Sequence, residues 1–265
     1  MTPQARARIA VAVLGASGRM GRAVVRLAHE AGLEVVLAIA ASEQGRDVGE
    51  LAGVGALGTK ITGDANALAT SGAAVLVDFS APAALVEAAA VCARAGVAIV
   101  SGTTGLDDAA KSALDVAAKG CAVLWEPNMS VVVHVLASLV EQALASLGPS
   151  FDVEIVETHH RAKVDAPSGT AIRLGDAVKN ARQGSYVNGR QGRPGPRTAG
   201  EIGMHAVRGG DVIGDHTVFF LGDGERIELT HRASSRDLFA HGAVRAAGWI
   251  AGKAPGRYRL GDILG

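Results

Sequence analysis

The sequence has little cysteine and no evident metal-ligand cluster. Its 265 residues include only two cysteines, Cys92 and Cys121, and neither has a CxxC partner. Both lie in apolar surroundings rich in Ala and Val, so we interpret them as buried thiols in a reducing compartment. The histidines have no cysteine or carboxylate nearby at zinc-ligand spacing, so we expect no metal site.

An excess of one charge and long apolar runs are also missing. Lys plus Arg and Asp plus Glu number 26 each, which argues against a broad nucleic-acid surface but leaves room for a local cationic pocket. No stretch approaches the ~20 continuous apolar residues of a membrane span. The N-terminal segment faintly resembles a signal peptide, but its apolar run ends in a glycine-rich turn, which favours a first strand. We therefore expect a cytoplasmic protein that binds neither nucleic acid nor membrane.

The first half of the chain alternates short apolar runs with helical segments. The pattern predicts strands over 8–15, 33–41 and 73–80, a strand followed by a loop over 97–105 and 121–128, and helices over 21–32, 82–96 and 106–120. Strands that alternate with helices indicate an α/β fold with a parallel sheet covered on both faces.

The pattern changes in the second half. A long helix is expected over 130–148, a half-exposed strand over 151–160, and strands joined by tight turns from about 201. The segments "RGGD" (208–211) and "GDGE" (222–225) are candidate hairpin turns. A parallel sheet followed by antiparallel strands predicts two domains, and we expect a last helix over 234–252 to return to the first.

The segment 182–200, "RQGSYVNGRQGRPGPRTAG", is rich in Gly, Pro and Arg and is expected to be a loop. Its four arginines are interpreted chiefly as a solvated surface. Attraction of an anionic substrate and contacts between subunits are the alternatives.

A glycine-rich turn joins the first strand to the first helix. In "VLGASGRMGR" the glycines are Gly15, Gly18 and Gly21, and Ser17 occupies the second glycine position of the usual GxGxxG fingerprint. Glycines let the backbone approach a pyrophosphate, and the helix N-terminus favours its charge. Because of this context we predict a dinucleotide site; the alternative is an ordinary tight turn.

The segment "AASEQGR" after the second strand should face the ribose of such a nucleotide. Ser42 or Glu43 could contact it, and Glu43 would favour NAD. Arg19 and Arg46 could instead hold the 2′-phosphate of NADP. The sequence does not choose between the two, and tolerance of both is a reasonable expectation.

Two further loops follow parallel strands, at the edge where ligands bind in such sheets. In "SGTTG", Gly102, Thr103 and Thr104 offer backbone and hydroxyl groups to a ribose or nicotinamide. In "EPNMS", Asn128 could anchor the carboxamide. The alternative is that both segments are simple strand–helix connections.

The segment "ETHHRAKVDAPSGTA" (157–171) crowds protonatable and cationic groups beside a glycine turn. His159, His160, Arg161 and Lys163 follow a strand, and a helix then begins at "SGT". A histidine can exchange a proton near neutral pH, and backbone N–H groups at a helix start attract an anion. A pair of surface or core histidines is the alternative, but Lys163 and the helix start favour a site for a carboxylated small molecule. Arg161 has no role that we can assign.

These motifs resemble those of the 4-hydroxy-tetrahydrodipicolinate reductases (dihydrodipicolinate reductases) of bacterial and plant lysine synthesis. The segment "EIVETHHRAKVDAPSGTA" matches the family signature nearly throughout, and the resemblance extends along the whole chain. The other matching segments, which occur in the family's order, are "GASGRMGR", "DFSAP", "GTTG", "PNMSVVV" and "HRASSRDLFAHGAVRAAGWI".

The resemblance implies a Rossmann-type domain over 1–129 and 241–265, and an α+β substrate-binding and tetramerisation domain with a mostly antiparallel open sheet over 130–240. It implies a homotetramer that reduces a small cyclic dicarboxylate with NADH or NADPH. In the catalytic step, His159 would be the acid/base and Lys163 its partner proton donor. The substrate would be held by His160, Ser168, Gly169 and Thr170. The residues lining the cofactor site would be Gly15, Ala16, Ser17, Gly18, Arg19, Met20, Ser42, Glu43, Gly102, Thr103, Thr104, Glu126, Pro127, Asn128 and Met129.

Two positions depart from the family pattern. Ser42 stands where many members have the acidic ribose ligand, and Met129 stands where some have an aromatic residue. Two other functions are weighed: a nucleotide-sensing Rossmann protein without turnover, and another two-domain amino-acid dehydrogenase. Intact His159 and Lys163 speak against the first, and the "HHRAKVDAPSGTA" segment speaks against the second.

Overall fold

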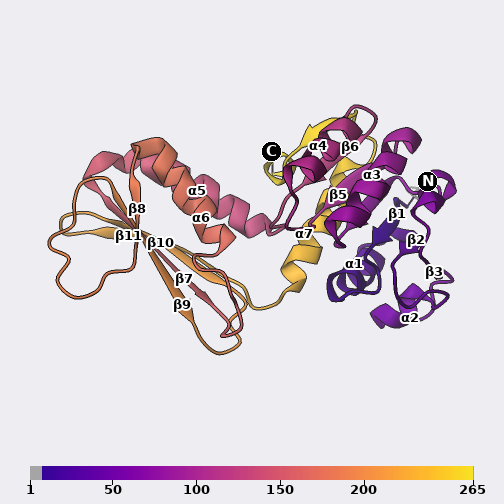
Figure 1. Ribbon diagram of the computed structural model, residues 1–265, viewed down its shortest axis with the longest axis horizontal. Helices are drawn as coiled ribbons and strands as arrows, with labels where there is room; N and C mark the ends of the chain where they lie inside the picture. Colours follow the sequence, from indigo (N-terminus) through magenta and orange to yellow (C-terminus); the bar gives the residue numbers. More distant parts are fainter. Residues whose placement is uncertain (1–7, 265) are drawn as a thin grey trace, which may run out of the picture. The chain divides into compact units, whose positions relative to one another are not determined.

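The computed structural model describes residues 8–264, and the chain divides into two compact units (Figure 1). The first unit contains the chain up to Ser130 and again from Asp237 onward. The second unit is the contiguous segment Val131–Arg236.

The first unit is built on a seven-stranded sheet in the order β12-β6-β5-β4-β1-β2-β3, in which every pairing is parallel. The strands are β1 Ala10–Leu14, β2 Glu34–Ile39, β3 Ile61–Thr62, β4 Val75–Asp78, β5 Ala98–Ser101, β6 Ala122–Trp125 and β12 Gly256–Tyr258. The strand order reverses between β1 and β4. In open parallel sheets ligands bind at such a switch point, beyond the carboxyl ends of the strands.

Helices bury both faces of this sheet, as the sequence predicts. They are α1 Arg19–Glu30, α2 Val48–Ala52, α3 Pro82–Ala95, α4 Asp108–Ala117 and α7 Asp237–Ile250, with 3-10 turns at Ala65–Thr70 and Leu260–Ile263. Alternate strand residues such as Ala12, Leu76 and Ile99 share a core with α3 and α4. The residues between them are buried too, and α1 and α7 contact the strands and each other. Cys92 and Cys121 are buried free thiols, as predicted.

The second unit contains a mixed five-stranded sheet in the order β11-β10-β7-β9-β8. Its strands are β7 Asp152–His159, β8 Ser185–Asn188, β9 Glu201–Arg208, β10 Asp215–Leu221 and β11 Arg226–Arg232. β10 is antiparallel to β7 and β11, whereas β9 is parallel to β7 and β8. Figure 1 shows the helices α5 (Val131–Leu147) and α6 (Gly169–Arg182) beside this sheet; both pack into the core on one of its faces.

One of the two predicted hairpins is wrong. At "GDGE" the N–H of Gly222 donates to the carbonyl of Glu225, and β10 and β11 pair across the turn as predicted. At "RGGD" the flanking strands β9 and β10 do not pair, because β7 lies between them. A local turn signal reports a reversal of the chain but not which strand the chain then joins.

Strand β7 carries different chemistry on its two faces, because successive side chains alternate. Val153, Ile155, Glu157 and His159 are buried on the side of the helices, whereas Glu154 lies on the opposite face. The predicted half-exposed strand is therefore correct, and its alternation decides which polar groups enter the second unit's interior.

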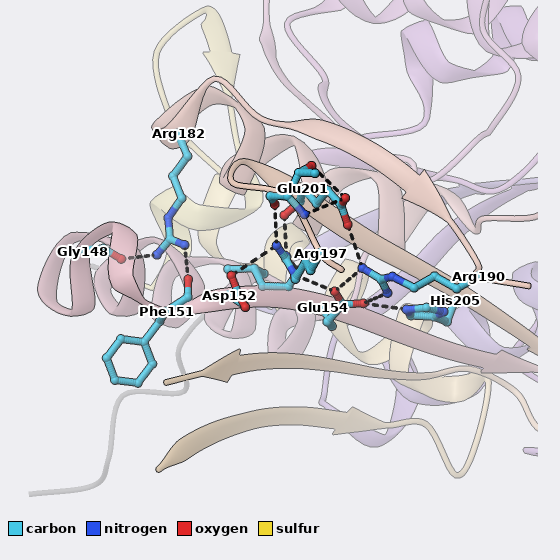
Figure 2. Close-up of polar contacts among 11 residues, drawn as sticks. Gly148, Phe151, Asp152, Glu154, Arg182, Arg190, Arg197, Glu201 and His205 are labelled. Carbon is cyan, nitrogen blue, oxygen red and sulfur yellow. Dashed lines mark hydrogen bonds and ion pairs between the residues drawn. The ribbon is translucent and has the colours of Figure 1, made fainter. Parts of the chain in front are cut away.

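The arginines of 182–200 are not simply a solvated surface (Figure 2). Arg190 donates to both carboxylate oxygens of Glu154, at 2.9 Å each, and Arg197 adds a bond of 3.2 Å. Arg182 donates to the carbonyls of Gly148 and Phe151. Among the described residues only the fourth arginine, Arg193, makes no hydrogen bond or ion pair. The prediction failed because Glu154 lies far from these arginines in the sequence.

Helix α5 is apolar along most of its length. With the 3-10 turn that follows it, the segment Val131–Ser150 is long and apolar enough to cross a membrane by length and composition, with a mean hydropathy of 1.6. Sequence analysis did not predict such a segment. In the structure Leu136, Val140 and Leu144 of this helix belong to the hydrophobic core of the second unit.

Candidate active site

The second unit places a carboxylate and a histidine at the end of β7. Glu157 and His159 point to the same side of the sheet because they are two residues apart on the strand. Glu157 is 1% exposed and His159 is 8% exposed. Nδ1 of His159 contacts Oε2 of Glu157 in a short hydrogen bond. His159 therefore has one ring nitrogen committed to a buried partner.

The Glu157 carboxylate has two further partners. Arg208, which lies opposite His159 in the parallel register of β7 and β9, donates to Oε2 at 2.8 Å and to Oε1 at 2.7 Å. The backbone N–H of Ser168 donates to Oε1 at 3.1 Å. Burial would raise the pKa of Glu157, but the bonds from Arg208 and His159 outweigh it, so the pKa is lowered. Glu157 is therefore ionised at neutral pH.

His159 is held in its neutral form by its surroundings. Burial lowers its pKa below the ordinary value, and the cations Lys163 and Arg208 act in the same direction. Glu157 raises the pKa but does not cancel these effects. A neutral imidazole at pH 7 can accept a proton, and it can donate one when a nearby anion favours the charged form.

The start of α6 is anchored beside this histidine. Ser168 is the N-cap, and its hydroxyl oxygen accepts the N–H of Ala171 at 3.2 Å. The same oxygen lies 3.1 Å from Nε2 of His216, whose ring is 5.2 Å from that of His159. Burial and the neighbouring histidines lower the pKa of His216 to about 4, so this ring is neutral. The first turn of α6, with Gly169 exposed, provides the positive end of a helix.

The remaining cationic residues of the motif separate in space. Lys163 pairs with Asp165, with Nζ 2.8 and 2.9 Å from the two carboxylate oxygens. His160 is half-buried and lies just beyond the strand, so it does not join the buried cluster of His159. Arg161 is exposed, and its backbone N–H donates to the carbonyl of Gly210. Lys163 contributes a cation near His159, whereas Arg161 still has no evident chemical role.

The glycine turn of the first unit has the geometry that a phosphate-binding turn requires. Gly15 has φ of +80°, and a Cβ there would lie 2.5 Å from the carbonyl oxygen of Phe79. A Cβ at Gly21 would collide with the carbonyl of Gly15. Gly18 is the N-cap of α1. Because a glycine has no side chain, the cap residue does not cover the N-terminus of this helix. Ala16 is buried behind the turn, and Arg19 and Met20 begin α1.

The loop after β2 brings the candidate ribose ligands near the glycine turn. The hydroxyl oxygens of Ser17 and Ser42 lie 2.9 Å apart. Glu43 has φ of +61° and forms an ion pair of 2.8 Å with Arg46. The two residues that are expected to favour different nucleotides therefore pair with each other at the surface.

A buried carboxylate connects the loops after β4 and β5. Asp78 is fully buried and accepts hydroxyl hydrogen bonds from Ser101 and Thr103 at 2.6 Å and from Ser80 at 2.5 Å. Burial raises the pKa of Asp78 even though these hydroxyls oppose the change. The carbonyl of Thr103 in turn accepts the indole N–H of Trp125 at 2.8 Å. This network fixes Thr103 in place, and sequence analysis did not identify Asp78 as part of it.

The other candidate cofactor residues lie at the same edge of the sheet. Gly102 packs so closely on the Phe79 ring that a Cβ would collide with it, and Thr104 is exposed. The side chain of Asn128 accepts the N–H of Ser130 at 2.8 Å, and Met129 is 1% exposed. Glu126 and Pro127 lie in the same loop after β6. The loops after β1, β2, β4, β5 and β6 therefore converge at the carboxyl edge of one parallel sheet.

Comparison with known families assigns both units. The family model described as dihydrodipicolinate reductase, N-terminus, matches residues 9–129, and the one described as dihydrodipicolinate reductase, C-terminus, matches residues 132–264. The chain belongs to the dihydrodipicolinate reductase family. The resemblance seen in the sequence motifs is thus confirmed over nearly the whole chain.

Individual relatives of this reductase agree with the family models. A 4-hydroxy-tetrahydrodipicolinate reductase of Halorhodospira halophila is 48% identical over 265 residues, covering 97% of this chain and 99% of the relative. One from Acinetobacter baumannii strain AYE is 45% identical and covers 96% of each chain. Among solved structures, the dipicolinate-bound dihydrodipicolinate reductase from Paenisporosarcina sp. TG-14 has a TM-score of 0.75 at 25% identity, covering 95% of this chain and 97% of that one.

Sequence analysis of this reductase missed three residues of the buried cluster. Glu157 is the first residue of the motif, but no role was predicted for it. Arg208 and His216 lie on β9 and β10, about 50 residues or more from it. The only signal in the sequence was the period-two alternation of β7, which places Glu157 on the face of His159. The other two become visible only when the strands pair.

Proposed function

We propose that this protein reduces 4-hydroxy-tetrahydrodipicolinate to tetrahydrodipicolinate with hydride from NADH or NADPH, in diaminopimelate and lysine biosynthesis. The observation that carries the proposal is the match of both family models, together with a buried His159–Glu157 pair beside the N-terminus of α6. Neither a nucleotide sensor without turnover nor another amino-acid dehydrogenase is favoured by the relatives.

The first unit would hold the dinucleotide at the switch point of its sheet. The Gly15–Gly18 turn and the N-terminus of α1 suit a pyrophosphate, because close backbone approach and the helix dipole both favour an anion there. Ser42 and Glu43 would meet the ribose, and the loops containing Thr103 and Asn128 would meet the nicotinamide end. The nicotinamide supplies the hydride when bound.

The second unit would hold the substrate and supply the proton. A cyclic dicarboxylate carries two negative charges, and the N–H groups of Gly169 and Thr170, with His160 and Lys163, would neutralise them. Loss of water from the 4-hydroxy compound gives a conjugated imine, and hydride addition to that imine builds negative charge that a proton must quench. His159 is the proposed donor, with Lys163 as its partner. Approach of the dianion would favour protonation of the otherwise neutral His159.

We also propose that the protein is a cytoplasmic homotetramer assembled through the second unit's sheet. The face opposite α5 and α6 carries several apolar side chains that are half-buried or exposed, among them Val156, Phe219 and Val207, the last 47% exposed. An arginine introduced by Val156→Arg should dissociate the assembly. In sedimentation velocity the matched change Val116→Arg, on the exposed face of α4, should leave it intact. A monomeric wild-type protein would contradict the proposal.

The activity is tested by a coupled assay. The unstable substrate is made in situ from pyruvate and aspartate semialdehyde, and the oxidation of NADH and of NADPH is followed separately. We expect substrate-dependent oxidation of at least one nucleotide. No oxidation with either nucleotide, by a folded protein in the presence of freshly made substrate, would contradict the proposed function.

A further inference from the structure

The hydrogen bonds of Glu157 determine which ring nitrogen of His159 carries hydrogen. An ionised carboxylate only accepts hydrogen bonds. Arg208 binds both oxygens of Glu157 and keeps the carboxylate ionised. The contact between Glu157 and Nδ1 of His159 therefore requires a hydrogen on Nδ1. In the neutral ring the lone pair then lies on Nε2.

The same geometry leaves Nε2 of His159 for chemistry. Among the described residues Nε2 makes no hydrogen bond. It lies close to Gly214, because a Cβ added to that glycine would be 2.9 Å from it. When the ring is protonated, the added proton must reside on Nε2, because Nδ1 already carries one. The transferable proton is thus confined to one atom.

We propose that Glu157 and Arg208 are positioning residues of this reductase: together they fix the Nδ1–H form of His159, so that Nε2 is the atom that exchanges a proton with the substrate. The inference rests on the acid/base role proposed above for His159. It assigns a role to two residues that do not themselves touch the substrate.

Arg208 also contributes through its charge. The groups that face His159 are Glu157 on β7, Arg208 on β9, His216 on β10 with His231 stacked behind it, and the Lys163–Asp165 pair in the following loop. Arg208 is the cation that binds Glu157, the hydrogen-bond partner of His159. Removal of its charge should therefore stabilise protonated His159, whereas a lysine in its place should not.

The amide variant Glu157→Gln should change which of the two ring forms His159 adopts. A glutamine has one acceptor atom and one donor atom where the carboxylate has two acceptors. At the Oε1 position an NH₂ group would face N–H groups of both Arg208 and Ser168. At the Oε2 position it would face one Arg208 N–H and Nδ1 of His159, and the ring can become an acceptor by moving its hydrogen to Nε2. The variant should therefore convert His159 to the Nε2–H form.

The test is a measurement of the ring nitrogens. Protein labelled with ¹⁵N in its histidine rings is studied by NMR, and the His159 signals are assigned by their loss in His159→Gln. The wild type should show the Nδ1–H form and Glu157→Gln the Nε2–H form. The kcat of Glu157→Gln should fall by roughly 10²- to 10⁴-fold, with a smaller change in KM for the dicarboxylate. An Nε2–H form in the wild type would overturn the proposal without any variant.

Two sets of controls separate positioning from general disturbance. Glu154→Gln makes the same change on the same strand, at a carboxylate also bound by arginines but on the opposite face, and should leave the His159 signals unchanged. Arg208→Gln should move the titration of His159 to higher pH, and Arg208→Lys should not. Identical titration curves for wild type and Arg208→Gln would contradict the role of Arg208.

The outcomes also separate this inference from the proposed function. If His159→Gln turns over normally, the acid/base role fails whatever the ring signals show. If His159→Gln is impaired but Glu157→Gln keeps both the wild-type ring form and the wild-type kcat, the reductase function stands and the positioning role is wrong.

Discussion

The two adjacent histidines differ because neighbouring side chains of an extended chain point in opposite directions. His159 is the last residue of β7 and is buried against Glu157, whereas His160 lies just beyond the strand and is half-buried. The buried member has an organised partner, a lowered pKa and a second histidine, His216, edge-on to its ring. These differences favour His159 for proton transfer and His160 for contact with the substrate.

Replacement of the proposed acid/base residue should affect chemistry more than binding. We expect His159→Gln to lower kcat by roughly 10²- to 10⁴-fold, because general acid–base catalysis contributes that much. Nucleotide affinity, measured by the fluorescence of bound NADH, should be nearly unchanged, since the residues proposed to bind the nucleotide lie in the first unit. Turnover at the wild-type rate would remove His159 from the mechanism.

Gly214 should matter because it leaves space for His159. In Gly214→Ala the added Cβ would lie 2.9 Å from Nε2 and 3.3 Å from Cδ2 of the ring, so the ring must shift. We expect kcat to fall between roughly 10- and 100-fold, since displacements of about 1 Å have such effects. At Gly209, also in the segment between β9 and β10, a Cβ meets nothing within 4 Å. Gly209→Ala should therefore retain kcat, and equal losses in the two variants would contradict the steric explanation.

At the scale of secondary-structure elements, the loops after β4 and β5 depend on one buried carboxylate. We expect Asp78→Asn to weaken NADH binding by roughly tenfold, because leaving a buried hydrogen-bonding group without its partner costs about 1–3 kcal/mol. The indole of Trp125 bonds to Thr103 in this network, so the tryptophan emission should shift as well. Binding of a dicarboxylate at the site proposed in the second unit should change little.

The exposed Asp115 on α4 provides the matched control for this change. Asp115→Asn should leave NADH affinity and tryptophan emission as in the wild type. A folded Asp78→Asn protein with wild-type NADH affinity would show that the network does not position the cofactor loops.

The sequence predicted elements well where their signals were local. The glycine turn, the capped start of α6 at Ser168 and the alternation of β7 could each be recognised within a few residues. The strands β3, β8 and β12 were not predicted, because they are short and, unlike the four-residue strands β4, β5 and β6, contain no continuous apolar run. Their existence depends on the neighbouring strand with which they pair.

The candidate site was predictable to the same extent. His159, Lys163 and the turn at Ser168 lie in one continuous motif, whereas Arg208 joins them only through the parallel pairing of β7 and β9. The error at "RGGD" has the same origin, because β7 separates the strands that the turn appeared to join. Local chemistry can be recognised along the chain, but pairing between distant strands cannot.

At the scale of the whole molecule, Glu154 should make stability depend on pH. Burial would raise its pKa, but Arg190, His205 and Arg197 lower it from 4.5 to about 2. The Glu154 carboxylate binds its proton at a lower pH in the folded protein than in the unfolded chain. Its stabilising contribution should therefore be complete above pH ~4.5 and should be lost as the pH falls toward 2. Urea unfolding of the wild type and Glu154→Gln should differ by roughly 2 kcal/mol at pH 7. The difference should shrink between pH 4.5 and 2.

The exposed pair of Glu228 and Arg226 offers a control for this prediction. Glu228→Gln should change the unfolding free energy by less than about 1 kcal/mol at either pH, since solvent screens surface pairs. A difference between wild type and Glu154→Gln that stays constant with pH would show that the carboxylate is not stabilised by its cations.

The division of the chain into a split first unit and a contiguous second one sets an order of events during synthesis. The second unit, Val131–Arg236, is translated in full before α7 and β12. Until then the first unit lacks the helix whose Ala240, Ala243 and Ile250 are fully buried in it. Synthesis of the first unit therefore begins first and is completed last. Ribosomes stalled just beyond Arg236 would carry a nascent chain with an open nucleotide domain, which is the stage at which it most needs a chaperone.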